Sequence, residues 1–229
     1  KNLFDAISPK TKVIFLGDTK QLPSVGAGNV LKDLINSKVV EVVTLNVVKR
    51  QGVDSGIIKN ANKIIAGDMV SSEKETQDAY VYKANDADDC AKKILTIMER
   101  LLVKYRIDEI QVLSPQRAGT VGVEYLNFII QEKFNPNNNE IRFLNKQISV
   151  TLQGDSSATK FDLFFKKGDK VIHTRNDYSA VWYRREGKTL VIDGENAGVS
   201  NGETGVIISL SEGKDINGNP LRRIIVRYD

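Results

Sequence analysis

Short apolar runs alternate with stretches of helical periodicity over the first 136 residues, and this alternation is the feature that most constrains the fold. Three runs have the composition of buried β-strands: residues 13–16, 39–45 and 110–115. Apolar residues recur every three or four positions in four intervening stretches, which predicts helices over 29–37, 56–66, 86–105 and 121–136. Strands and helices in this order predict an α/β fold, with a parallel sheet whose two faces are covered by helices.

The sequence changes character near residue 165, where the helical periodicity stops. Three β-rich runs follow, separated by glycine and asparagine turns: GDKVIHTRNDY, ETGVIISLSE and RRIIVRYD. These runs predict a small all-β module. Residues 160–188 hold eight Lys or Arg against four Asp or Glu, together with six aromatic residues. A basic and aromatic stretch of this kind suits contact with nucleic acid, although a solvated basic face is the alternative.

Residues 179–200 separate the first two β-rich runs, and we expect them to form an extra hairpin. WYRR and TLVID flank EGK, and Glu-Gly suits a tight turn. The hairpin carries Trp182, Arg184 and Arg185. These side chains suit either a stacking and phosphate-binding edge or a charged edge that prevents strand pairing.

Composition excludes several classes of protein. With 229 residues and 41% apolar content the chain can bury a core, and a net charge of +4 neither demands nor excludes nucleic acid. One cysteine, Cys90, and one histidine, His173, cannot form an internal disulfide or a structural zinc site. Apolar runs fall far short of the roughly 20 residues that span a bilayer, and the start lacks a signal-peptide core. We therefore expect a cytoplasmic protein without metal site or membrane contact.

A polar, glycine-rich loop, GDTKQLPSVGAG at 17–28, follows the first apolar run. Ligands of open parallel sheets bind beyond the carboxyl ends of the strands, so we expect Asp18 and Gln21 to face a ligand crevice. A carboxylate can orient a metal-bound water or a cation, and a glutamine can bridge a phosphate oxygen to a water. Gly26 and Gly28 permit positive φ or close backbone approach. An ordinary surface loop is the alternative.

Five blocks of the sequence, in the correct order, resemble superfamily 1 DNA helicases of the RecD/TraA branch, which include the exodeoxyribonuclease V alpha subunit. The blocks are VIFLGDTKQLPSVGAGNVLKDLI, LNVVKRQGVDSGIIKNANKIIAGD, VLSPQRAGTVGVEYLNFIIQEKFNP, FKKGDKVIHTRNDY and NGETGVI. The resemblance implies two RecA-like domains that clamp ATP and move along single-stranded DNA in recombination or repair. It also implies three parts: the end of the first RecA-like domain at 1–52, the start of the second at 53–163, and an incomplete Src-homology-like β-barrel insert at 164–229.

The resemblance assigns the catalytic and nucleotide-binding roles to the first two blocks. Gln21 matches the motif III glutamine, which senses the γ-phosphate or its attacking water. Arg50 matches an arginine that reaches across the cleft and stabilises charge on the transferring phosphoryl group. Gly17 and Asp18 complete the expected nucleotide-binding set.

The resemblance also indicates seven residues for contact with DNA: Pro23, Ser114, Arg117, His173, Arg175, Asn176 and Tyr178. Arginine, amide and aromatic side chains suit sequence-tolerant binding of a single strand. A structural role is the alternative for Ser114 and Arg117, and a histidine satisfied within its strand is the alternative for His173.

The sequence departs from the family pattern because it has no GxxxxGK[ST] phosphate loop, no Asp-Glu pair before motif III, and no motifs V and VI. We therefore expect an internal segment that is inactive alone and binds no cofactor, whose full-length parent uses ATP and Mg²⁺. Other recombination or nuclease subunits are further candidate partners. Two other interpretations stay open: a non-enzymatic module that binds single-stranded nucleic acid, and the helicase part of a conjugative relaxase.

Overall fold

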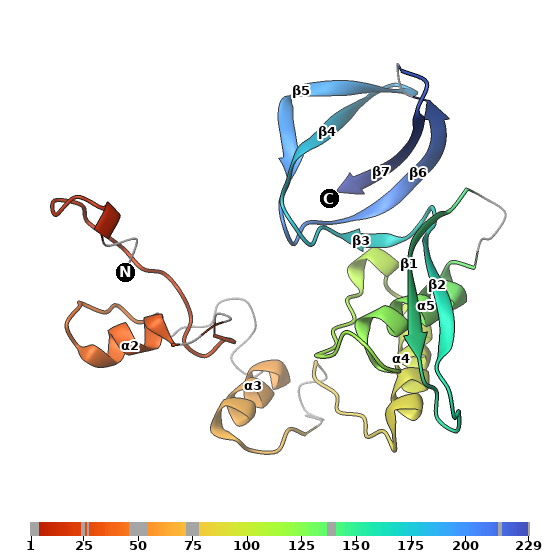
Figure 1. Ribbon diagram of the computed structural model, residues 1–229. Helices are drawn as coiled ribbons and strands as arrows, with labels where there is room; N and C mark the ends of the chain where they lie inside the picture. The colour runs from red at the N-terminus through yellow and green to blue at the C-terminus, as the bar shows by residue number, and fades with distance from the viewer. Residues whose placement is uncertain are drawn as a thin grey trace. The chain divides into compact units, whose positions relative to one another are not determined.

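The computed structural model describes residues 5–23, 26, 28–45, 55–71, 78–136, 141–214 and 217–228. The chain divides into two compact units, Lys1–Tyr82 and Lys83–Asp229, shown in Figure 1. Each unit is described by itself below. The predicted three-part division at residues 52 and 163 stays a prediction.

The first unit contains two helices where the sequence predicts them, α2 (Val30–Ser37) and α3 (Gly56–Ala66). Side-chain oxygens cap both N-termini, because the Asn29 side chain accepts from Lys32 N at 3.4 Å and the Ser55 hydroxyl accepts from Ile57 N at 3.2 Å. Helix α3 ends at Gly67, whose φ of 82° is left-handed and therefore favours glycine.

The predicted strands of the first unit are not formed. Residues 13–16 and 39–45 are neither strand nor helix, and their apolar side chains are exposed, with Leu16 at 92% and Leu45 at 93%. A buried parallel strand needs hydrogen-bonded neighbours and helices over both faces. Among the described residues of this unit, no strand is formed beside either run, so neither belongs to a sheet.

The second unit begins with helical elements: α4 (Ala87–Leu101), the short 3₁₀ helix η1 (Ile107–Glu109) and α5 (Val123–Phe134). Asp86 caps α4 by accepting from Asp89 N at 2.8 Å, as the acidic cluster at its start predicts. Helices α4 and α5 confirm the helices predicted over 86–105 and 121–136. The strand predicted at 110–115 is absent, since these residues pair with no strand among those described.

A two-stranded antiparallel sheet, β1 (Phe143–Val150) and β2 (Thr159–Phe165), packs on α5. Ile148, Val150 and Leu163 are buried there, and the partly buried residues around them are Tyr125, Phe128, Leu152 and Phe161. The Phe128 and Phe161 rings lie 4.7 Å apart. The aromatic stretch of the sequence is therefore divided, because Phe161 belongs to this core and not to a basic face.

The last part of the chain forms a β module of five strands, as predicted. β3 (Lys170–Ile172), β6 (Thr204–Lys214) and β7 (Pro220–Tyr228) make an antiparallel sheet in the order β3-β6-β7. The expected hairpin also forms, as a ribbon of β4 (Asp177–Glu186) and β5 (Thr189–Val199). Its two-residue turn starts at Gly187, whose φ of 63° suits a type II′ turn.

The predicted parallel sheet is not observed among the described residues, and the predicted, incomplete β-barrel is not closed. Every strand pair among the described residues is antiparallel, and the β4–β5 ribbon pairs only with itself. The β module therefore consists of two sheets without shared backbone hydrogen bonds (Figure 1), and side chains of both sheets line one cavity. A barrel would need the ribbon to share a hydrogen-bonded edge with β3 or β7.

A buried polar cluster joins α5 to the turn that leads into β3. The Asp169 carboxylate accepts from Gln131 Nε2 at 2.6 Å, Asn135 Nδ2 at 2.8 Å and Lys166 N at 2.7 Å. Burial raises the pKa of Asp169, although these three hydrogen bonds act in the opposite direction. Lys166, which is 2% exposed, pairs with Glu132 at 2.7 Å. The cluster fixes the start of the β module on the helix.

Candidate nucleic-acid interface and the Gly17–Pro23 loop

The loop after residue 16 is organised by Asp18. Its carboxylate accepts from Lys20 N at 2.9 Å and from Gln21 Nε2 at 3.1 Å, and its carbonyl accepts from Gln21 N at 3.3 Å. The Gln21 amide is thus held through its nitrogen. No described residue donates to its oxygen, so that oxygen can accept from a ligand or water.

Helix α2 packs closely on this loop. A Cβ at Gly17 would lie 2.6 Å from Leu31 Cδ2, so glycine at this position allows the helix to approach. Gly26 and Gly28 have φ of 131° and 93°, as the sequence predicts for this turn. Gly17 therefore has a packing role that is independent of any nucleotide.

A pocket of about 310 Å³ lies between the loop and α2, and Asp18, Gln21, Pro23 and Asn29 are its polar or turn-forming lining residues. No lysine or arginine lines it, so this pocket does not by itself fit a nucleoside triphosphate. Arg50 lies outside the described residues. The expected pairing of Gln21 with Arg50 at one cleft thus stays a prediction.

The Ser114–Arg117 block closes the loop that precedes α5. The Ser114 hydroxyl donates to Val121 O at 2.7 Å and accepts from Gln116 N at 3.2 Å. Arg117 Nε donates to Glu124 Oε1 at 2.8 Å, and Lys146 contacts the same oxygen. Lys146 and Arg117 together lower the pKa of Glu124. These hydrogen bonds give both predicted residues a structural partner, while the exposed Arg117 side chain stays accessible to a ligand.

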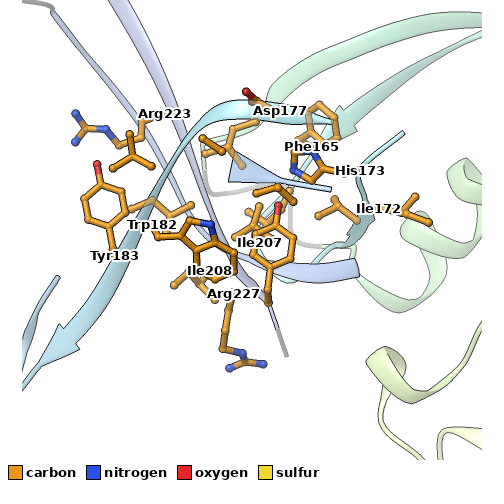
Figure 2. A pocket seen from close by; sticks show the side chains of 18 of the residues that line it. Phe165, Ile172, His173, Asp177, Trp182, Tyr183, Ile207, Ile208, Arg223 and Arg227 are labelled. Carbon is orange, nitrogen blue, oxygen red and sulfur yellow. The ribbon is translucent and has the colours of Figure 1, made fainter. Parts of the chain in front are cut away.

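A cavity with a volume of about 1160 Å³ lies in the β module and is shown in Figure 2. All five strands, β3 to β7, contribute side chains to its lining. The volume exceeds the roughly 300–1,000 Å³ of typical small-ligand sites. Three residues that the sequence analysis assigned to DNA contact line it together: His173, Arg175 and Asn176.

Aromatic rings form the interior of this cavity. The Tyr228 ring lies 5.8 Å from His173 and 5.5 Å from Trp182. Trp182 Nε1 donates to Gly198 O at 2.6 Å, which fixes the indole within the ribbon. Burial raises the pKa of Tyr228, and the charges of Glu203 and Asp177 act in the same direction. His173 and Trp182 thus pack against Tyr228 and hold the two sheets together.

Asn176 links the two β-rich blocks at one end of the cavity. Its Oδ1 accepts from Asn201 N at 2.7 Å, and its Nδ2 donates to Tyr178 Oη at 2.9 Å. Hydrogen bonds from Ser179, and to a smaller extent the charge of His173, lower the pKa of the neighbouring Asp177. The Tyr178 ring is exposed and does not line the cavity. Asn176 therefore orients Tyr178 at the rim.

Four further cationic side chains line the cavity and are not among the predicted site residues. They are Arg185 on β4, Lys188 in the ribbon turn, and Arg223 and Arg227 on β7. Arg185 and Arg223 each stand beside a second arginine, Arg184 or Arg222, that does not line the cavity. Residue type alone could not separate the two members of each pair.

Neither a metal cluster nor a membrane span is found in the described ranges. No group of three or more His, Cys, Asp or Glu among those residues is placed to hold a metal ion. None of the described helices has the length and apolar character needed to cross a bilayer.

Comparison with known proteins gives a family match and curated relatives. A family described as "AAA domain" matches residues 1–86. The chain is also 27% identical over 179 residues to the ATP-dependent RecD2 DNA helicase of Deinococcus radiodurans, an alignment that covers 78% of this chain and 21% of the relative. The chain thus spans about a fifth of that relative's length. No solved structure matches significantly. These matches confirm the resemblance that the sequence blocks predict: most of the chain is similar to a RecD-like DNA helicase.

Proposed function

We propose that the chain is part of a longer ATP-dependent DNA helicase that couples ATP hydrolysis to movement along single-stranded DNA, in recombination or repair in the cytoplasm. The similarity to RecD2 over 78% of the chain supports the helicase class. The match of residues 1–86 to an AAA domain supports a nucleotide-dependent parent. ATP and Mg²⁺ belong to that parent, because the pocket in the first unit does not fit a triphosphate alone.

Gln21 would be the contribution of the first unit to the ATP site. Its side chain is exposed and held through its nitrogen by Asp18 at 3.1 Å, so its orientation is fixed before any ligand arrives. An amide oxygen in that position can orient the water that attacks a phosphate. Other parts of the full-length protein would supply the phosphate loop and the metal ligands.

The β module would be the contribution of the second unit, as a surface that holds the DNA strand. The observation that carries this proposal is the 1160 Å³ cavity, whose lining combines aromatic rings with arginines and a lysine. Such a combination is typical of proteins that bind single strands without sequence preference. The same observation is compatible with a non-enzymatic binding module, and the experiment below separates the two. The context of the full-length gene separates a stand-alone helicase from a relaxase or a nuclease subunit.

DNA-stimulated ATP hydrolysis by the full-length protein tests the proposal. We expect Gln21→Ala and Arg50→Ala each to lower kcat by at least about 100-fold, the loss typical of a missing transition-state contact. Gln147→Ala is the matched control, because Gln147 also donates to an aspartate, Asp162, at 2.8 Å but lies in the second unit. Full activity in both site variants would refute the site assignment. A full-length wild type that binds DNA without hydrolysing ATP would favour the non-enzymatic module.

A further inference from the structure

The turn of residues 166–169, called the clasp below, is bonded to strand β6 through its backbone. Gly168 N donates to Ile207 O at 2.8 Å, and Ile207 N donates to Asp169 O at 2.9 Å. Ile207 is 1% exposed, so these hydrogen bonds lie next to the buried part of the β module. The clasp is therefore a fixed part of that module.

The side chains of the clasp contact the C-terminal end of helix α5. The Asp169 carboxylate accepts from Gln131 Nε2 at 2.6 Å and from Asn135 Nδ2 at 2.8 Å. Lys166 Nζ lies 2.7 Å from Glu132 Oε1. The clasp thus connects the β module to the helix, since its backbone bonds to one and its side chains bond to the other.

The two amides of α5 are held in the orientation that donates to Asp169. Gln131 Nε2 also donates to Phe164 O at 2.8 Å, and Asn135 Nδ2 also donates to Lys167 O at 2.9 Å. Turning either amide over would replace both of its hydrogen bonds by contacts between oxygen atoms. Within the described ranges, no buried side-chain nitrogen or oxygen lacks a partner. A fully paired buried network of this kind specifies one arrangement of the groups that it joins.

The apolar residues on either side of the clasp belong to different clusters. The described members of the cluster on α5 come from α5, β1, β2 and the loop between these two strands. Val199 and Ile207 are buried within the β module and do not belong to that cluster. Because apolar attraction is non-directional, two separate clusters do not by themselves fix one orientation of the module. Directional polar contacts are needed for that.

Lys166 is the least expected member of the clasp, because a lysine is almost never fully buried. Its side chain is 3% exposed, whereas the side chain of its partner Glu132 is 45% exposed. Desolvation of a buried ammonium offsets most of its attraction to a carboxylate, so such a pair adds little stability. It does restrict geometry, since the buried ammonium has to keep its partner within reach.

We propose that Lys166 and Asp169 are positioning residues, which hold the β module in one orientation on helix α5. Both act through α5 and neither lines the cavity. The functional consequence rests on the proposed function: a module that holds DNA stimulates ATP hydrolysis only if its orientation to the rest of the protein is fixed. The inference deepens that function because both residues lie outside the predicted site residues.

Other contacts also link the module to the preceding part of the second unit. Lys170 Nζ donates to Ile110 O at 2.8 Å, and Phe165 at the end of β2 lines the cavity. The Arg222 guanidinium lies 5.3 Å from the centre of the Phe143 ring. If these contacts alone set the orientation, loss of the clasp would leave the orientation unchanged.

The distance between two spin labels in the complete 229-residue chain measures the orientation. Asn127→Cys on α5 and Lys214→Cys on β6 place the labels at exposed positions, and Cys90→Ser removes the native thiol. Unfolding of each labelled protein in urea is measured alongside.

The clasp variant is Lys166→Met, in which an unbranched apolar side chain replaces the buried lysine. Lys133→Met is the matched control, because it removes the same charge and an ion pair of 2.8 Å to Glu99 that does not involve the clasp. Asp169→Asn is a second clasp variant, whose amide turns a donor toward groups that donate to the carboxylate.

We expect Lys166→Met to broaden the distance distribution at an unchanged urea midpoint, because the exposed Glu132 is hydrated once its partner is gone. Asp169→Asn should broaden the distribution and lower the midpoint, and Lys133→Met should keep the wild-type width. In the full-length protein, Lys166→Met should lower the maximal DNA-stimulated rate of ATP hydrolysis by at least about tenfold, as misplacement far from the reacting atoms can. Its affinity for DNA without ATP should stay unchanged.

Three results would overturn the inference. A distribution as narrow as that of the wild type in both clasp variants would mean that other contacts set the orientation. Equal broadening in Lys133→Met would mean a general loosening of the second unit. Broadening in Lys166→Met with an unchanged rate of ATP hydrolysis would remove its functional consequence. A wild-type full-length protein without DNA-stimulated hydrolysis would instead refute the proposed function and leave the label distances valid, so the two failures are distinguishable.

Discussion

The two units of the chain differ in where their apolar residues lie. The buried core residues, Ala91, Met98, Leu126, Phe143, Ile148, Val150, Leu163, Val199 and Ile207, all belong to the second unit. In the first unit the β-strand-like runs are exposed, and the buried described residues there are Ser55 and Gly56. The first unit thus carries the Gly17–Pro23 loop beside locally capped helices, while the second has a buried core.

The largest expected effect tests where the core lies. Ile207→Ala removes a side chain that is 1% exposed and should cost about 2–5 kcal/mol of the free energy of unfolding. Ile14→Ala makes the same chemical change at a residue that is 72% exposed in the first unit, and should cost less than about 0.5 kcal/mol. Fluorescence of Trp182, the single tryptophan, reports unfolding of the second unit in urea, and amide hydrogen exchange in α2 and α3 reports on the first unit. An equal loss of unfolding free energy at Ile207 and Ile14 would contradict the difference in burial between the two units.

A smaller effect is expected at the joint between α5 and the β module. Asp169→Ala removes the acceptor of the Lys166 N–H and one of the two acceptors of each of the Gln131 and Asn135 amides, which should cost about 1–3 kcal/mol. Asp162→Ala is the control, since Asp162 accepts one exposed hydrogen bond from Gln147. Both variants are compared by the same urea titration. A loss at Asp162 as large as that at Asp169 would rule out a special role for the joint.

Capping of α3 provides a test confined to the first unit. The Ser55 hydroxyl accepts from Ile57 N at 3.2 Å and donates to Asp78 at 2.5 Å, so Ser55→Ala should destabilise the helix by about 0.5–2 kcal/mol. Amide hydrogen exchange should become faster in α3 and stay unchanged in α5. Faster exchange in both helices would mean that the two units are not independent, and would weaken the comparison.

The smallest expected effect is on the pH dependence of the stability of the second unit. Lys146 and Arg117 lower the pKa of Glu124, so its contribution to stability is present above the ordinary glutamate pKa and is lost as pH falls through the lowered folded value. Glu124→Gln should therefore make the stability of the second unit less dependent on pH below about 5. Thermal unfolding between about pH 3 and 7 measures this dependence. A variant with the same pH dependence as wild type would exclude the assigned ion pairs.

The sequence predicted the locally determined parts of the fold. Helices α2 to α5 follow from the apolar spacing of their sequences. The structure adds side-chain caps at Asn29, Ser55 and Asp86 and a left-handed stop at Gly67. The ribbon likewise followed from its turn residues. Parallel strands at 13–16 and 39–45 could not be decided locally, because an apolar run becomes a strand only beside a partner strand.

Only those residues of the candidate site that lie close together in the sequence were predicted. His173, Arg175 and Asn176 carry a motif and line the cavity together. Arg185, Lys188 and Arg223 lie on separate strands or turns and meet only through tertiary packing. Asp169 was missed because a buried hydrogen-bonded aspartate has the same sequence signature as a turn aspartate.

The central claim is that the first unit responds to nucleotide and the second holds DNA, and titration of ATP hydrolysis by the full-length protein with single-stranded DNA tests it most directly. Gln21→Ala should lower the maximal rate and leave the half-stimulating DNA concentration unchanged. The Arg185→Gln, Arg223→Gln variant should raise that concentration by at least about tenfold. If instead Gln21→Ala shifts the half-stimulating concentration and the Arg185→Gln, Arg223→Gln variant does not, the assignment of the two units is contradicted.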